Sequence, residues 1–327
     1  MERPTRPAAP PDPSASVWTL SDGHAGNVRQ AAALAHALGI GSARSWTLKP
    51  RLPWRWLAPH RWPGSEYAFG ADFAGALAAP PRLAIGCGRQ AALATRLLRA
   101  QGAKSVQILD PRIDPRHWDL VIAPQHDGLR GANVISLLGS LHPVDDLWLA
   151  RARADFAAFA DLPRPRTALL LGGSSRHVRF ERMAFEVLAT KLEAALAHDG
   201  GSVLVTTSRR TPRELRDVLR HRYVETPGLT WLDPQDGDNP YPGLLAWADR
   251  IVCSPDSVNM ISEACATDVP VHVFDPARAR GPLRAFLDSL LARGRIRALD
   301  RTLAPFDVQP LRETARVAAE VRARLGL

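Results

Sequence analysis

The sequence predicts an α/β protein of two Rossmann-like, doubly wound parallel-sheet domains that face each other across a cleft. Three observations predict this fold. Short apolar runs alternate with segments of helical spacing in both halves of the 327 residues. The apolar runs are nearly continuous, as in strands that are buried on both faces of a parallel sheet. A break with the sequence LPRPRT, residues 162–167, separates the two halves.

Both halves repeat the order of strand and crossover helix that parallel sheets require. The strands expected in the first half are residues 16–22, 43–49, 82–88, 105–110, 119–124 and 133–139, and the helices are 28–38 and 90–99. The strands expected in the second half are 167–173, 201–208, 229–233, 249–256 and 269–275. The helices expected there are 181–198, 212–221, 243–248, 257–266 and 282–292.

The domain boundary is expected near Pro163 and Pro165, because proline ends the helix-like stretch before them. A proline-rich start with few apolar residues predicts a disordered tail, and it lacks the apolar core of a secretory signal. The predicted divisions are a tail 1–16, a first domain 17–150, a linker 151–166, a second domain 167–309 and a C-terminal helix 310–327 that packs back on the first domain.

Composition bounds the partners and the compartment. The formal charge of +9 fits either an anionic partner or a compositional bias toward arginine, since only three lysines are present. No zinc-finger spacing or aromatic RNA-binding motif is found, so no nucleic-acid partner is expected. Three scattered cysteines indicate a reducing compartment, and no apolar run approaches the roughly 20 residues that cross a bilayer. We therefore expect a cytoplasmic protein, peripheral at most to the inner face of a membrane.

The first strand is followed by SDGHAGN, residues 21–27, which leads into a helix. Gly23 permits a close approach of the backbone to a ligand, and the helix that follows presents N–H groups to an anion. Asp22 and His24 are candidates for proton transfer, with Asn27 beside them on the acceptor side. The alternative is that Asp22 caps the helix and His24 lies on an ordinary exposed turn.

Two strand ends in the second half are typical of phosphate sites. Gly172 and Gly173 precede Ser174 and Ser175, whose hydroxyl and N–H groups suit a phosphate, although a glycine turn with a serine cap remains open. At the next strand end, Arg209 lies in the pair Arg209-Arg210, which is suited to a diphosphate or is simply a solvated loop.

The run CSPDSVNMISEA, residues 253–264, predicts a third strand end that opens a helix. Ser254 and Ser257 lie where the helix N-terminus can receive phosphate. Glu263 follows about one and two-thirds turns later, where its carboxylate is suited to both hydroxyls of a ribose. The alternative is a surface glutamate, which the small and apolar neighbours make less expected.

In the first half, Asp110, Arg112 and His126 follow predicted strands and are assigned to the acceptor side. The nearby histidines lack a recognised metal spacing, so no metal site is predicted. An acidic loop at Asp236 and Asp238 suits either Mg²⁺ or a plain lead into a helix, and we prefer the plain loop.

Tryptophans alternate with arginines in RLPWRWLAPHRWPG, residues 51–64. Trp54, Trp56 and Trp62 in such a mixture are typical of a segment that lies at the headgroup level of an anionic membrane. Tryptophans buried in an irregular loop are the alternative.

These motifs, in this order, resemble those of the mitochondrial-fission-factor (ELM1-like) family over nearly the whole chain after the tail. The segments that carry the resemblance are SDGHAGNVRQAAALAHALG, VQILDPRIDPRHWDLVIAPQHD, LLLGGSSRH, VTTSRRTP, DNPYPGLLAWAD and SPDSVNMISEACATDVPVHVF. The last segment also resembles the donor-site helix of two-domain glycosyltransferases of the GT-B type.

The resemblance implies a nucleotide-sugar site in the second domain, with a UDP-linked sugar the first to test and no cofactor or metal required. Glu263 is similar to the ribose-binding glutamate of GT-B enzymes and Ser174 to their phosphate-loop serine. His24 is similar to the histidine in the glycine-rich loop of the lipid-II-forming transferases, which implies a lipid-linked or envelope acceptor. Nucleotide-sugar epimerisation and a membrane-associated scaffold without activity are the alternatives, because a fold alone does not confer activity.

Overall fold

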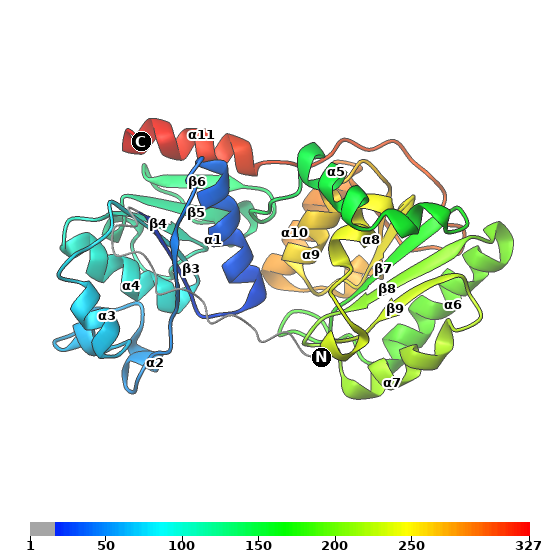
Figure 1. The fold of residues 1–327 in the computed structure, drawn as a ribbon. Helices are drawn as coiled ribbons and strands as arrows, with labels where there is room; N and C mark the ends of the chain where they lie inside the picture. The colour runs from blue at the N-terminus through cyan, green and yellow to red at the C-terminus, as the bar shows by residue number, and fades with distance from the viewer. Residues whose placement is uncertain (1–16) are drawn as a thin grey trace, which may run out of the picture. The chain divides into compact units, whose positions relative to one another are not determined.

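In a computed structural model the structure describes residues 17–327, so the predicted tail, 1–16, lies outside the described residues. The chain folds as two compact units (Figure 1). Unit 1 comprises the residues up to Leu137 together with Thr314–Leu327, and unit 2 comprises Leu138–Glu313. The expected linker, 151–166, thus falls within unit 2. Within the described residues, no helix is both long enough and apolar enough to cross a membrane.

Unit 1 is built on a six-stranded parallel sheet in the order β2-β1-β3-β4-β5-β6, and all six strands were predicted. The strands are β1 (Val17–Ser21), β2 (Arg44–Thr47), β3 (Leu83–Cys87), β4 (Lys104–Ile108), β5 (Leu120–Pro124) and β6 (Val134–Leu137). The helices are α1 (Ala25–Ala37), α2 (Trp54–Leu57), α3 (Ala71–Ala76), α4 (Arg89–Ala100) and α11 (Thr314–Leu325), with 3₁₀ turns η1 (Ser65–Tyr67), η2 (Pro115–His117) and η3 (Gln125–Asp127).

The C-terminal helix α11 completes unit 1. It packs against α1 and β6, and its residues Val317, Val321 and Leu325 are buried. Arg322 donates a hydrogen bond of 2.9 Å to the carbonyl oxygen of Ala37 at the end of α1. The last residues of the chain therefore belong to the same core as the first strands.

Unit 2 contains a second parallel sheet of six strands, in the order β9-β8-β7-β10-β11-β12. The strands are β7 (Arg166–Leu171), β8 (Ser202–Thr207), β9 (Gly228–Trp231), β10 (Arg250–Cys253), β11 (Val271–Val273) and β12 (Ile296–Ala298). The helices are α5 (Asp146–Asp155), α6 (Arg182–Asp199), α7 (Arg213–Arg222), α8 (Tyr241–Trp247), α9 (Val258–Cys265) and α10 (Gly281–Ala292), with 3₁₀ turns η4 (Ala157–Asp161), η5 (Pro234–Asp236) and η6 (Pro276–Arg278).

Five of these strands were predicted, and the short β12 was missed. Its three residues include two exposed ones, so it lacks the continuous apolar run that identifies a buried strand. It joins the sheet because it pairs in parallel with β11.

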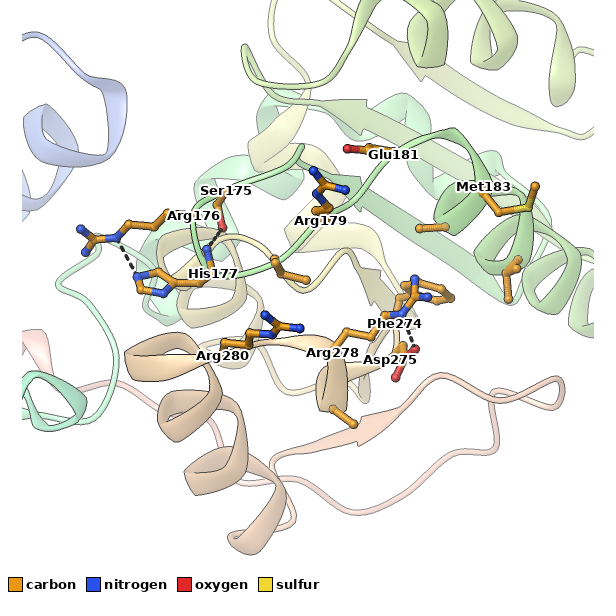
Figure 2. A pocket seen from close by; sticks show the side chains of 14 residues that line it. Ser175, Arg176, His177, Arg179, Glu181, Met183, Phe274, Asp275, Arg278 and Arg280 are labelled. Carbon is orange, nitrogen blue, oxygen red and sulfur yellow. Dashed lines mark hydrogen bonds and ion pairs between the residues drawn. The ribbon is translucent and has the colours of Figure 1, made fainter.

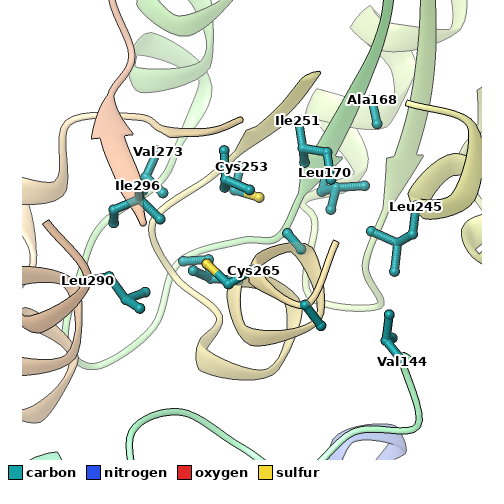
Figure 3. Packing of buried hydrophobic residues seen from close by; sticks show 14 of the residues in the cluster. Val144, Ala168, Leu170, Leu245, Ile251, Cys253, Cys265, Val273, Leu290 and Ile296 are labelled. Atoms are coloured by element: carbon teal, nitrogen blue, oxygen red, sulfur yellow. The ribbon is translucent and has the colours of Figure 1, made fainter. Parts of the chain in front are cut away.

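The core of unit 2 lies on both faces of its sheet. On one face, Leu170, Ile251 and Cys253 of the strands pack with Cys265 of α9 and Leu290 of α10 (Figure 3). Burial raises the pKa of the Cys265 thiol to about 12. These cysteines therefore act as small apolar side chains rather than as reactive thiols.

The order of the strands indicates where a ligand would bind in each unit. In a doubly wound sheet, ligands bind at the carboxyl ends of the strands where the winding reverses direction. That point lies between β1 and β3 in unit 1 and between β7 and β10 in unit 2. The segments after β1, β7 and β10 are three of those in which the sequence predicted functional residues.

Candidate functional site

In unit 2, the backbone after β7 lies so close to the loops after β8 and β10 that it has no room for side chains of its own. A Cβ atom added at Gly172 would overlap the carboxylate of Asp256, and one added at Gly173 would overlap the backbone of Arg210. The Gly173 N–H donates to Asp256 Oδ2 at 3.2 Å. The two glycines are thus required by tertiary packing at the reversal point.

Asp256 is the centre of a hydrogen-bond network that joins three strand ends. Its side chain is fully buried, and Arg210 of the β8 loop donates to its Oδ2 at 2.6 Å while remaining 46% exposed. Ser254 donates to Asp256 Oδ1 at 2.6 Å and accepts the Gly172 N–H at 2.7 Å. Removal of Asp256 would leave these donors without their acceptor, so we assign it and Ser254 to positioning the loops.

Three serines at these strand ends lie nearer the solvent. Ser174 Oγ accepts the N–H of Phe180 at 2.9 Å, and Ser175 Oγ accepts that of His177 at 3.2 Å. Ser257 Oγ caps α9 by accepting the Met260 N–H at 3.3 Å. A hydroxyl that accepts a backbone N–H keeps its own hydrogen, which can be donated to a phosphate oxygen.

Glu263 lies on α9 and is buried, with 3% of its surface exposed. The hydroxyl of Tyr241, at the start of α8, donates to Glu263 Oε2 at 2.5 Å. His142 is buried near the same carboxylate, and this burial lowers the pKa of its imidazole. The carboxylate is thus oriented by a tyrosine that was not among the predicted site residues. Tyr241 does lie in DNPYPGLLAWAD, one of the segments that carry the family resemblance.

The two arginines of the β8 loop differ in their surroundings. Arg209 is exposed and, within residues 17–327, makes no hydrogen bond or ion pair. Arg210, by contrast, is joined to the network through Asp256. Adjacent residues in a loop point in different directions, so the sequence could identify the pair but not which member is held at the site.

In unit 1, Asp22 is fixed at the end of β1 by neighbouring donors. It accepts the His24 N–H at 3.0 Å and the side-chain amide of Asn27 at 3.0 and 3.2 Å. Gly23 between them has φ of +80°, in the left-handed region that favours glycine. The His24 ring is 81% exposed, and its Nε2 lies 3.9 Å from Asp22 Oδ2, beyond hydrogen-bond distance.

Cys87, at the end of β3, extends this arrangement. Burial, reinforced by the Asp22 charge, raises the pKa of its thiol well above the usual range. The protonated thiol donates to Asn27 Oδ1 at 3.6 Å. This contact directs the amide N–H groups of Asn27 toward Asp22. The sequence marked the strand that ends in Cys87 but gave no signal that its thiol would face the β1 loop.

The neighbouring strand ends of unit 1 are held by charge. Arg112, with φ of +64°, donates its N–H to Asp110 at 2.7 Å, and its guanidinium lies 3.8 Å from Asp127. His126 is in η3 beside that aspartate. The structure thus places these predicted acceptor-side residues at the ends of β4 and β5, along the same edge of the sheet as Asp22. No group of three or more His, Cys, Asp or Glu side chains in residues 17–327 is arranged to hold a metal.

The tryptophans of the predicted membrane segment separate into two kinds. Trp56 and Trp62 are 71% and 56% exposed, with Leu52 and Tyr67 exposed nearby. Trp54 is half-buried and packs against the core of unit 1. The alternation of tryptophan and arginine therefore did not distinguish the inward-facing Trp54 from the two exposed rings.

Comparison with protein families identifies a family whose model covers most of the chain. A family model described as mitochondrial fission ELM1 matches residues 25–325. The mitochondrial fission protein ELM1 of Arabidopsis thaliana is 30% identical over 276 residues, which cover 75% of this chain and 64% of the plant protein. The chain thus spans less than two thirds of the length of that relative.

Comparison with solved structures identifies the fold. The UDP-N-acetylglucosamine 2-epimerase from Rickettsia bellii superposes with a TM-score of 0.54 at 13% identity and 94% coverage of both chains. The co-structure of MnaA from S. aureus with UDP gives 0.53 at 11% identity, covering 95% of this chain and 97% of that one. The fold is therefore GT-B-like, with two doubly wound parallel sheets.

Proposed function

The chain belongs to the mitochondrial fission ELM1 family, and from this premise we propose that unit 2 binds a nucleoside-diphosphate sugar and that the protein transfers the sugar to an acceptor. The observation that carries the proposal is the network around Asp256, which joins the ends of β7, β8 and β10 at the reversal point of the sheet. The UDP in the MnaA structure, which has the same fold, supports this choice of ligand.

The proposed donor site assigns a separate task to each group. The diphosphate lies against the loop of Ser174 and Ser175 and the N-terminus of α9 at Ser257, where the helix dipole favours negative charge. Arg210 retains donors for a phosphate oxygen because only part of its guanidinium is used by Asp256. Glu263 accepts hydrogen bonds from the ribose hydroxyls, with Tyr241 holding its second oxygen.

In the proposed transfer, the bond from the anomeric carbon to the diphosphate oxygen breaks, and the diphosphate leaves with the electron pair. A bond forms between that carbon and the acceptor oxygen, and His24 takes up the proton of the acceptor hydroxyl. Asp22 stabilises the resulting imidazolium once the exposed ring turns toward it. No metal has a step in this scheme.

A second candidate is epimerisation of the nucleotide-linked sugar, which the similarity to the Rickettsia bellii 2-epimerase favours. Transfer and epimerisation are separated by their products, a glycosylated acceptor or an isomerised nucleotide sugar.

For the transfer reaction, we propose that the acceptor is linked to a lipid. This choice is supported by the exposed Trp56 and Trp62 beside arginines of the same segment.

Thermal unfolding with UDP and UDP-linked sugars tests the donor site. A ligand at about 100 times its Kd adds roughly 2.7 kcal/mol to the free energy of unfolding, so Tm should rise by several degrees. Glu263→Gln should reduce that rise while leaving the Tm of the free protein close to wild type, and Tyr241→Phe should reduce it less. Unchanged Tm with every nucleoside diphosphate at millimolar concentration would rule out the donor site.

A further inference from the structure

A cavity of about 890 Å³ lies in unit 2 beside the proposed phosphate loop. Ser175 of that loop lines it, together with residues of α6 and the segment after β11. Its volume is within the range of small-molecule sites. Its two principal walls are joined, because the Arg280 N–H donates to the His177 carbonyl oxygen at 2.9 Å.

The cavity is lined by four arginines and only two carboxylates. Arg176 donates to the His177 ring at 2.8 Å, and Arg278 lies 3.2 Å from Asp275. Arg179 and Arg280 enter from the loop after β7 and from the segment after β11 (Figure 2). Neither of these two guanidinium groups has a hydrogen-bond or ion-pair partner among residues 17–327.

Like charges gathered around one cavity repel each other, and an anion between them removes that repulsion. A guanidinium also binds a carboxylate or phosphate through two parallel hydrogen bonds. The diphosphate of the donor already has its own partners in Ser174, Ser257 and Arg210. The arginines of the cavity are therefore in excess of what a neutral sugar on that diphosphate would require.

We infer that this cavity binds an anionic substituent on the sugar, so that the donor is an acidic nucleotide sugar such as a uronic acid. The position of this anion on a nucleotide-linked donor rests on the proposed function. A carboxylate or phosphate that enters the cavity is expected to contact Arg179 and Arg280, which both line it. Aliphatic stems and the apolar wall of Val178 and Phe274 leave room for the uncharged face of the ring.

Binding of four probes to the full-length protein, measured by calorimetry at fixed salt, tests this inference. The probes are UDP, UDP-glucose, UDP-glucuronate and glucuronate 1-phosphate. We expect UDP-glucuronate to bind roughly tenfold or more tightly than UDP-glucose, since one charge-assisted contact is worth that ratio. Arg179→Gln with Arg280→Gln should abolish the preference and leave UDP binding within about twofold.

Arg182→Gln with Arg293→Gln is the matched control, because this pair removes the same two charges and both arginines are exposed but do not line the cavity. Arg280→Lys should keep part of the preference, since it keeps the charge but loses the bidentate contact. Equal affinity for the two sugars in wild type, or a preference that survives the double substitution, would overturn the inference and leave the donor site standing.

Loss of UDP binding separates the two proposals. If UDP fails to bind but glucuronate 1-phosphate binds and depends on Arg179 and Arg280, the anion site stands and the donor site fails. If glucuronate 1-phosphate binds equally to wild type and the double variant, an adventitious anion only is bound and the inference is overturned. If none of the probes binds, both proposals are wrong.

Discussion

Asp22 illustrates how a single carboxylate is held in place by groups from two strand ends. The His24 N–H and the Asn27 amide hold it, and the Cys87 thiol in turn orients that amide. The imidazole of His24 is not held by this carboxylate, since its ring is exposed and lies outside hydrogen-bond distance of it. At this scale the structure places a fixed carboxylate beside an exposed imidazole.

Substitution of these two residues should separate binding from turnover. Asp22→Asn and His24→Ala should leave the affinity for UDP within about twofold, because the proposed donor site lies in unit 2. Loss of proton transfer typically costs 10²- to 10⁴-fold in rate, so kcat for sugar transfer should fall in that range. Turnover at the wild-type rate in both variants, measured by release of the nucleoside diphosphate, would show that the β1 loop has no catalytic role.

A second residue-scale prediction concerns acid stability. Burial lowers the pKa of His272 to about 4, with Arg250 and Arg297 lowering it and Asp300 opposing them. In the unfolded chain the same imidazole has a pKa near 6.5 and is protonated first. The free energy of unfolding therefore falls as the pH falls from about 6.5 to 4. The His272 imidazole accounts for a loss on the order of 3 kcal/mol in the free energy of unfolding over this range.

His272→Leu should flatten that pH dependence, as measured by chemical unfolding between pH 7 and 4.5. His221→Leu, a change to an exposed histidine of α7, is the control and should not alter it. An equally steep loss of stability in the His272 variant would show that other groups cause the acid sensitivity.

At the scale of elements, α2 presents Trp56 to the solvent while Trp54 joins the core of unit 1. Side chains of α4 bind the backbone of α2. Arg89 donates to the carbonyl oxygens of Arg55 and Trp56, and Gln90 donates to that of Arg55 at 3.2 Å. Because these hydrogen bonds hold the backbone of α2, its position does not depend on burial of the Trp56 side chain. Arg51, Arg55 and Arg61 of the same segment are also exposed.

This surface should bind anionic membranes. Sedimentation with vesicles that contain phosphatidylglycerol should recover the protein, and recovery should fall several-fold with Trp56→Ala and Trp62→Ala and with added salt. Met183→Ala, which removes an exposed apolar side chain of α6, is the matched control and should have no effect. Equal binding to vesicles of phosphatidylcholine alone would contradict the electrostatic part of this prediction.

At the scale of the whole molecule, the C-terminal helix packs with the N-terminal strands and helices in unit 1. Residues Thr314–Leu327 belong to unit 1, although the whole of unit 2 precedes them in the sequence. The buried face of α11 consists of Val317, Ala318, Val321 and Leu325. Unit 1 can therefore complete its core only after the last residues are in place.

Polar substitutions on that face should loosen unit 1 selectively. Val317→Ser with Val321→Ser places hydroxyls among apolar side chains and should cost about 2–5 kcal/mol. Hydrogen exchange should quicken in α1 and β6, which α11 contacts, and stay unchanged in β7 and β8. Uniform acceleration across both units would mean that the molecule unfolds as one cooperative body.

Local patterns in the sequence were sufficient for eleven of the twelve strands in residues 17–327. Strands such as β3 and β5 are buried on both faces and are therefore continuous apolar runs. They also predicted that polar residues follow the strands, since the carboxyl ends of parallel strands are where ligands bind. The short β12 escaped because two of its three residues are exposed.

Tertiary structure alone decided which of those residues meet. The pairing of Arg210 rather than Arg209 with Asp256, the contact of Tyr241 with Glu263 and the gathering of Arg179 and Arg280 around one cavity all join segments far apart in the chain. No local pattern encodes such contacts, because they depend on the order in which the strands assemble into sheets. The sequence by itself determined the fold class and the loops that carry the candidate site residues. The order of the strands determined the partners of each side chain.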